Sequence, residues 1–137
     1  MLSQLLIATG ACIYGWLGCA HIAFTFFSRM FSTRDPDVEA GMKRTSMMLT
    51  SKTSMWNCWV GFNASHSLGI LVFAGVYLLL AVTHMEVFQQ TPALLWLAVG
   101  TSFGYFALAI KYWFYAPILG TLTATACFLL SALLLSA

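Results

Sequence analysis

Apolar residues fill four long stretches of the chain, separated by shorter polar segments. The stretches cover about residues 2–27, 55–82, 93–110 and 116–136. A membrane-spanning helix needs roughly 20 mainly apolar residues, and each stretch is close to that length. The pattern therefore predicts an all-α fold, a bundle of four transmembrane helices in one integral membrane domain covering residues 1–137.

Composition points the same way. The chain is 61% hydrophobic and 7% charged, whereas soluble domains carry about 25% charged residues. The net charge of +2 gives no reason to expect a nucleic-acid partner. We expect membrane lipids as neighbours, together with other membrane subunits or further copies of the chain. The four cysteines form no CxxC pair, so no zinc site is expected, and they are interpreted as small hydrophobes.

The basic residues indicate how the chain crosses the membrane. All six Lys and Arg residues lie between spans one and two or at Lys111, and the opposite loop has none. Loops rich in Lys and Arg usually stay in the cytoplasm. Residues 28–54 and 111–115 are therefore predicted to be cytoplasmic, with both termini outside.

The first loop is predicted to contain a short amphipathic segment at the cytoplasmic surface. Asp35 and Pro36 are a favourable N-cap and first helical residue. At helical spacing, one apolar face then follows, made of Val38, Met42, Thr45 and Leu49. The Ser- and Thr-rich residues 50–54 favour a break before span two, although the segment could instead continue span two downward.

Span two opens with polar and aromatic residues. One helical face collects residues at positions i, i+4, i+7, i+8 and i+11, namely Trp59, Asn63, His66, Ser67 and Ile70. Trp56 extends this face by a turn. Polar side chains are costly inside a bilayer unless they have partners, so this face predicts a buried polar site.

A second ridge on span two is made of small residues spaced by four: Gly61, Ser65 and Gly69. Small residues at this spacing let another helix approach closely.

Span one carries a matching stripe of Tyr14, Gly18, His21 and Thr25. His21 and His66 can therefore approach each other, or one cavity, from the cytoplasmic half. Four small residues of span four can line the remaining wall of that cavity: Gly120, Thr121, Ala124 and Thr125.

Three interpretations of this cluster stay open. The cluster is an interhelical lock of hydrogen bonds, or the lining of a pocket for a lipid, quinone or other flat apolar ligand, or it supplies His21 and His66 as axial haem ligands. Catalysis is not predicted, because no carboxylate lies inside a span. The candidate site residues are His21, Trp56, Trp59, Asn63, His66 and Ser67.

Several segments together resemble an uncharacterised family of small bacterial four-helix integral membrane proteins. They are Ala20-His21, Phe31-Ser32-Thr33-Arg34-Asp35, Met42-Lys43 and the run from Trp56 to Gly69, whose core is Gly-Phe-Asn-x-Ser-His-Ser. The resemblance covers about the first two-thirds of the chain and implies a bacterial inner (plasma) membrane location. It implies no substrate, cofactor or mechanism.

The sequence thus predicts a non-catalytic membrane protein, an accessory or interaction subunit of a complex or homo-oligomer, whose Asn/His cluster joins spans one and two. The alternative is a protein that binds haem, quinone or lipid through His21 and His66, with haem b or a quinone as candidate cofactors.

Overall fold

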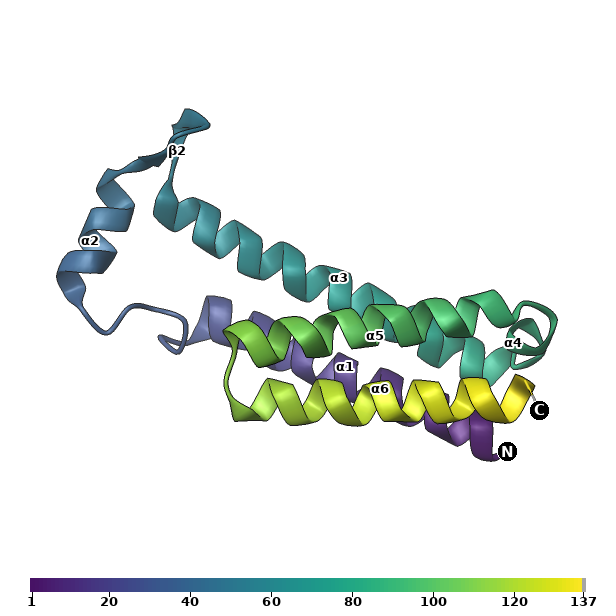
Figure 1. The fold of residues 1–137 in the computed structure, drawn as a ribbon. Coiled ribbons are helices and arrows are strands. Elements are labelled where there is room, and N and C mark those ends of the chain that lie inside the picture. Colours follow the sequence, from purple (N-terminus) through teal and green to yellow (C-terminus); the bar gives the residue numbers. More distant parts are fainter. Residues whose placement is uncertain (137) are drawn as a thin grey trace. The chain divides into compact units, whose positions relative to one another are not determined.

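The computed structural model describes residues 1–136 and is built almost entirely from helices (Figure 1). Four helices are long: α1 (Leu2–Phe27), α3 (Met55–Thr83), α5 (Pro92–Tyr112) and α6 (Tyr115–Ser136). Each is long and apolar enough to cross a membrane, so the chain is a multi-pass membrane protein. The predicted all-α class is confirmed, and every predicted span end lies within two residues of the observed one.

Between α1 and α3 lies the short helix α2 (Pro36–Arg44), which begins as predicted. The Asp35 carboxylate accepts a hydrogen bond from the Asp37 amide at 2.9 Å, and Pro36 occupies the first turn. This cap satisfies an amide that has no partner within the helix.

A hairpin of β1 (Ser46–Met47) and β2 (Thr50–Ser54) follows α2. The sequence did not predict it. Because α2 ends at Arg44, the prediction that Leu49 shares a helical face with Val38 is wrong: Leu49 lies in the hairpin turn. The predicted break before α3 is present. There the Ser54 hydroxyl accepts a hydrogen bond from the Asn57 amide at 3.2 Å and so caps α3.

The connection from α3 to α5 contains a second short helix, α4 (Glu86–Gln90). It places Phe88 in the core, where the ring is fully buried and stacks on Tyr77 with ring centroids 5.9 Å apart. Glu86 stays exposed, and its carboxyl pKa is lowered by the hydrogen bond from its own backbone amide and then by the side chain of His84.

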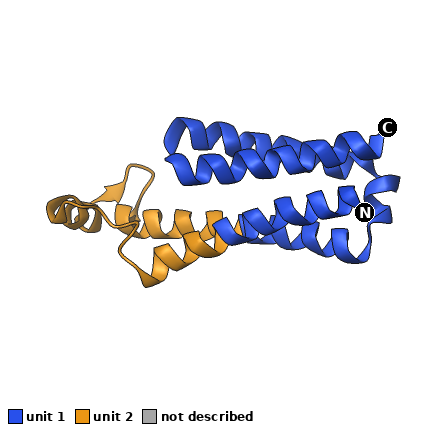
Figure 2. Cartoon of the chain, turned by 90° about the horizontal axis from the view of Figure 1, so that it is seen from below, with its two compact units in different colours: residues 1–17, 70–137 blue, residues 18–69 orange. Residues whose placement is uncertain are grey.

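The chain divides into two compact units, coloured separately in Figure 2. Unit 1 contains residues 1–17 and the chain from Ile70 onward, so it includes parts of all four long helices. Unit 2 is Gly18–Gly69 and contains the end of α1, the α2 and hairpin segment, and the beginning of α3.

Aromatic rings from three helices form the centre of unit 1. Tyr14 of α1, Phe73 and Tyr77 of α3, and Phe128 of α6 contact one another with centroid separations between 4.6 and 6.5 Å. The Tyr14 hydroxyl donates to the Ser102 carbonyl at 3.4 Å, and the Tyr77 hydroxyl donates to the Leu94 carbonyl at 2.6 Å. Both phenol hydroxyls thus have a hydrogen-bond acceptor on the backbone of α5, which a buried hydroxyl needs.

The close approach of α1 to α6 depends on Gly10. A Cβ atom at this position would lie 3.0–3.2 Å from three carbons of the Phe128 ring. That ring is fully buried and held by Tyr14, Phe73 and Tyr77, so it has no free direction in which to move.

We expect Gly10→Ala to lower the free energy of unfolding by about 1–3 kcal/mol, because overpacking a closed core forces side chains or backbone to shift. Denaturant unfolding in one fixed detergent measures this change. Gly104→Ala is the matched control, since its Cβ would meet nothing within 4 Å. It should leave stability unchanged or raise it by up to about 1 kcal/mol, because Ala favours a helix over Gly. Equal effects of the two substitutions would contradict the packing argument.

Candidate functional site

Within unit 2, the last turns of α1 and the first turns of α3 bring three of the candidate residues together. His21 Nε2 lies 2.9 Å from Asn63 Oδ1, and the rings of His21 and His66 are 5.1 Å apart between centroids, inclined at 64°. The two histidines, 45 positions apart in the sequence, therefore meet edge to face.

Asn63 is the centre of this cluster. Its side chain is only 1% exposed, and both ends of its amide are used. The oxygen accepts from His21, and Nδ2 donates to the Trp59 carbonyl at 2.7 Å. In this arrangement His21 Nε2 carries the hydrogen, since an amide oxygen only accepts.

Ser67 extends the same network along α3. The residue is fully buried, and its hydroxyl donates to the Asn63 carbonyl at 2.8 Å. Asn63 and Ser67 thus both have hydrogen-bond partners within the protein. That is the condition for keeping such groups in an apolar environment.

The two tryptophans lie at the edge of the cluster and hold other segments to α3. Trp59 is 37% exposed, and its indole nitrogen donates to the Phe31 carbonyl at 3.0 Å. Trp56 lies under the ammonium group of Lys43 from α2, with 5.1 Å between Nζ and the ring centroid. Trp56 and Trp59 therefore attach the linker and α2 to the start of α3.

Aromatic rings that the sequence reasoning did not select cover the two imidazoles. Phe31 contacts the His21 ring at 4.5 Å, and Phe62 stacks nearly parallel on His66 at 6.1 Å. Phe24 in turn contacts Phe31. Phe31 lies after the end of α1, so no helical spacing predicts that it folds back onto His21.

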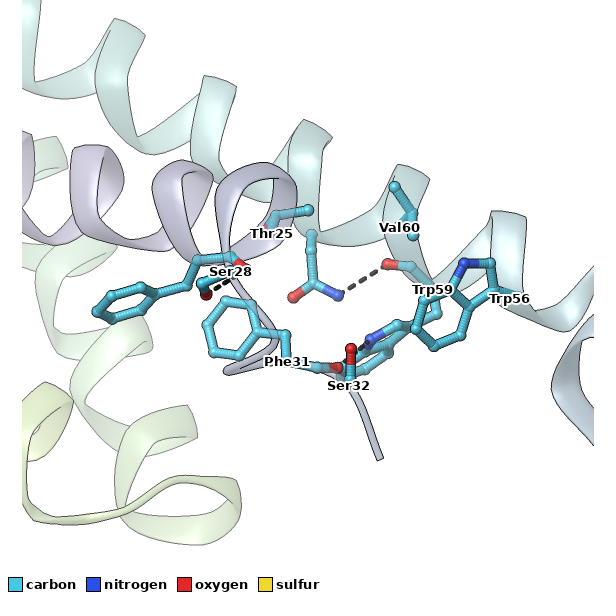
Figure 3. Close-up of a pocket in the computed structure, with 9 residues that line it drawn as sticks. Thr25, Ser28, Phe31, Ser32, Trp56, Trp59 and Val60 are labelled. Carbon is cyan, nitrogen blue, oxygen red and sulfur yellow. Dashed lines mark hydrogen bonds between the residues drawn. The ribbon is translucent and has the colours of Figure 1, made fainter. Parts of the chain in front are cut away.

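A small open pocket lies beside Asn63, with a volume of about 240 Å³ including its mouth. In Figure 3, Thr25 borders it from α1, and Trp56, Trp59 and Val60 border it from α3. Ser28, Phe31 and Ser32 border it from the segment that follows α1. The Thr25 and Ser28 hydroxyls donate to the carbonyls of His21 and Phe24. Only about 20 Å³ of this volume is open to the centre of a water molecule, which is room for about one water and far too little for a drug-sized ligand.

Other predicted neighbours of the site are placed differently. The hydroxyls of Thr121 and Thr125 donate to the Pro117 and Thr121 carbonyls of their own helix. Both threonines belong to unit 1, whereas the cluster belongs to unit 2. The cavity wall that these threonines were expected to form therefore stays a prediction.

The ridge of small residues on α3 faces outward. Gly61, Ser65 and Gly69 are exposed, and a Cβ added at either glycine would meet nothing within 4 Å. Among the described residues, then, no side chain or helix of this chain occupies the ridge.

The chemistry available to the cluster is limited. Across residues 1–136 no group of three or more His, Cys, Asp or Glu side chains is arranged to hold a metal ion. The groups that do converge are two imidazoles, one amide and one hydroxyl, which make hydrogen bonds but include no acid and base pair of the kind that proton-transfer catalysis uses.

Comparison with protein-family models gives no match, and no curated protein or solved structure is significantly similar to the chain.

We expect Asn63→Ala to lower the free energy of unfolding by about 1–2 kcal/mol, because His21 Nε2 loses a buried acceptor and a void replaces the amide. Denaturant unfolding of the purified protein, in a detergent that keeps it folded, measures the loss.

Asn57→Ala is the matched control for this substitution. Asn57 lies on the same helix, exposed to solvent, and its replacement should change stability by less than about 0.5 kcal/mol. If both alanines cost the same, the His21–Asn63 bond contributes nothing to stability.

Proposed function

We propose that this chain is a non-catalytic accessory subunit of a membrane assembly, and that its Asn/His cluster is a lock that fixes α1 against α3. The observation that carries the proposal is that both the oxygen and the nitrogen of the Asn63 amide are hydrogen-bonded. Both ends of a fully buried amide are used in hydrogen bonds within the chain. A group whose hydrogen bonds are already made inside the protein is suited to hold helices together rather than to bind a substrate.

The lock gives the assembly a rigid element rather than an active centre. His21 and Asn63 join the two helices, Trp59 joins α3 to the linker, and Lys43 joins α2 to Trp56. These contacts fix the direction in which the outer face of α3 points. That face carries the ridge of Gly61, Ser65 and Gly69, where small residues permit close approach of another helix.

The location that fits this role is the inner membrane of a bacterium. The distribution of Lys and Arg favours residues 28–54 and 111–115 in the cytoplasm, with both termini outside. The resemblance of the Trp56–Gly69 run to small bacterial four-helix proteins supports the same location. Under this proposal, the partner is another membrane subunit or a second copy of the chain.

Association through the ridge is tested by Gly61→Leu in protein reconstituted into lipid nanodiscs or kept in a mild detergent. We expect a bulky side chain on the ridge to weaken the assembly, raising its dissociation constant about tenfold or more. Native mass spectrometry and light scattering measure the change.

Gly104→Leu is the control for the ridge. It adds the same side chain to α5 at another position where a Cβ meets open space, and it should leave the assembly intact. If the wild-type chain is monomeric in its native membrane and co-purifies with no subunit, the accessory role is wrong.

The alternative function, binding of haem, quinone or lipid through His21 and His66, is favoured by the convergence of the two rings. Their edge contact at 5.1 Å leaves no space for a porphyrin between them, and haem ligation would require the His21–Asn63 bond to break.

An absorption spectrum of protein purified from its native membrane, before and after dithionite, separates the two functions. If the cluster is an interhelical lock, the spectrum should show only tryptophan and tyrosine absorption. A Soret band at one haem per chain would instead show that the histidines ligate haem.

A further inference from the structure

The linker between α1 and α3, here named the arm (residues 28–54), ends in an apolar tip. Met48 and Leu49 occupy the turn of the β1–β2 hairpin, and their exposed fractions are 106% and 88%. Hairpin turns normally carry Gly, Asn, Asp or Ser, which suit the tight backbone and face water. Two fully exposed apolar side chains in a turn instead indicate a surface that is covered in the native environment.

The charges around this tip have one sign. The arm contains five of the six basic residues of the chain, and no Asp or Glu occurs anywhere from Ala40 to Met85. The acidic residues of the arm lie earlier, at the first turn of α2 and its cap. Glu39, the nearest of them, is bound to Lys43 at 2.6 Å and lies 4.0 Å from Arg29.

Arg44, the last residue of α2, and Lys52, in the middle of β2, are both exposed and have no ion pair among the described residues. The Glu39 carboxyl has a lowered pKa, chiefly because Lys43 donates a hydrogen bond to it. It therefore remains ionised and balances Lys43, so that the uncompensated positive charge lies at the hairpin.

The direction of the arm suits contact with a membrane surface. Within unit 2, α2 and the hairpin run across the axis of α3 rather than continuing it (Figure 1). A helix that crosses the bilayer lies near its normal, so segments that run across it lie along the bilayer surface. The 29 residues of α3 span about 43 Å at a rise of ~1.5 Å per residue, which carries the helix through the ~30 Å hydrocarbon core and into the headgroup layer.

We propose that the hairpin tip, Met48 and Leu49, inserts into the headgroup layer of the bilayer that holds the chain, and that Arg44 and Lys52 bind the phosphates of anionic phospholipids there. Apolar burial and headgroup charge then act together, as in other interfacial anchors. An isolated two-stranded sheet is only marginally stable in water. Contact with the bilayer would therefore stabilise the hairpin.

The test measures amide hydrogen exchange at the tip in the full-length protein. The protein is reconstituted into nanodiscs of phosphatidylcholine alone and into nanodiscs containing about one third phosphatidylglycerol; nanodiscs leave both membrane faces accessible. We expect the amides of Met48 and Leu49 to exchange about fivefold more slowly, or slower still, when phosphatidylglycerol is present. Added salt should reverse much of this difference, because it screens headgroup charge.

Two pairs of variants separate the contributions. Met48→Ser with Leu49→Ser should remove the slow exchange, whereas the exchanged pair Met48→Leu with Leu49→Met should keep it, because apolar area is preserved. Arg44→Gln with Lys52→Gln should remove the dependence on phosphatidylglycerol. Lys111→Gln, which removes a cation outside the arm, should keep it.

Three results would overturn the proposal. Equally fast exchange in both lipids would show that the tip stays in water. Equally slow exchange in both would show burial without recognition of charge. Fast exchange in both lipids that becomes slow only when a soluble protein is added would make the arm a protein-docking surface instead.

Discussion

The hydrogen-bonding needs of the buried Asn63 amide constrain the positions of the residues around it in unit 2. An amide inside an apolar helix pair is tolerated only if its donor and acceptor are both used, because the bilayer core supplies no water to replace them. His21 Nε2 donates to the amide oxygen of Asn63, and the amide nitrogen of Asn63 donates to the Trp59 carbonyl. Ser67, Trp59 and Phe31 then take positions consistent with that pair, and the surrounding phenylalanines close over the imidazoles.

The same constraint bears on the chemistry that the most polar segment of α3 offers. In an enzyme, polar groups converge on a cavity and keep some hydrogen-bonding capacity for the substrate. Here the adjacent pocket is small, and its Thr25 and Ser28 hydroxyls are engaged with α1 carbonyls. The polar residues of α3 are therefore consistent with holding the protein together. The contacts proposed above for partners and lipid lie elsewhere, on the ridge of small residues and at the hairpin tip.

Much of the fold could be predicted from the sequence, because four uninterrupted apolar stretches leave few alternatives and the Asp35-Pro36 start is a strong local signal. The approach of His21 to His66 could be raised as a hypothesis, since each residue lies on a stripe with helical spacing. The hairpin could not be predicted, because residues 46–54 lack a turn dipeptide such as Asn-Gly. Its strand β2 also contacts α2, which no local pattern indicates. Phe31 was missed for a similar reason, since its position over His21 depends on how the chain turns after α1 ends.

The two units also differ in when they can form during synthesis. The His21–Asn63 pair is separated by 42 positions, so the lock can close once the first two spans are in the membrane. The contact of Gly10 with Phe128 must wait for α6, which follows the other three long helices in the chain. Until then, Tyr14 and its α1 neighbours in unit 1 lack part of their final packing, and this is the interval in which a nascent membrane protein most depends on chaperones or the insertion machinery. The His21–Asn63 contact can thus form before the helices that complete unit 1 have been made.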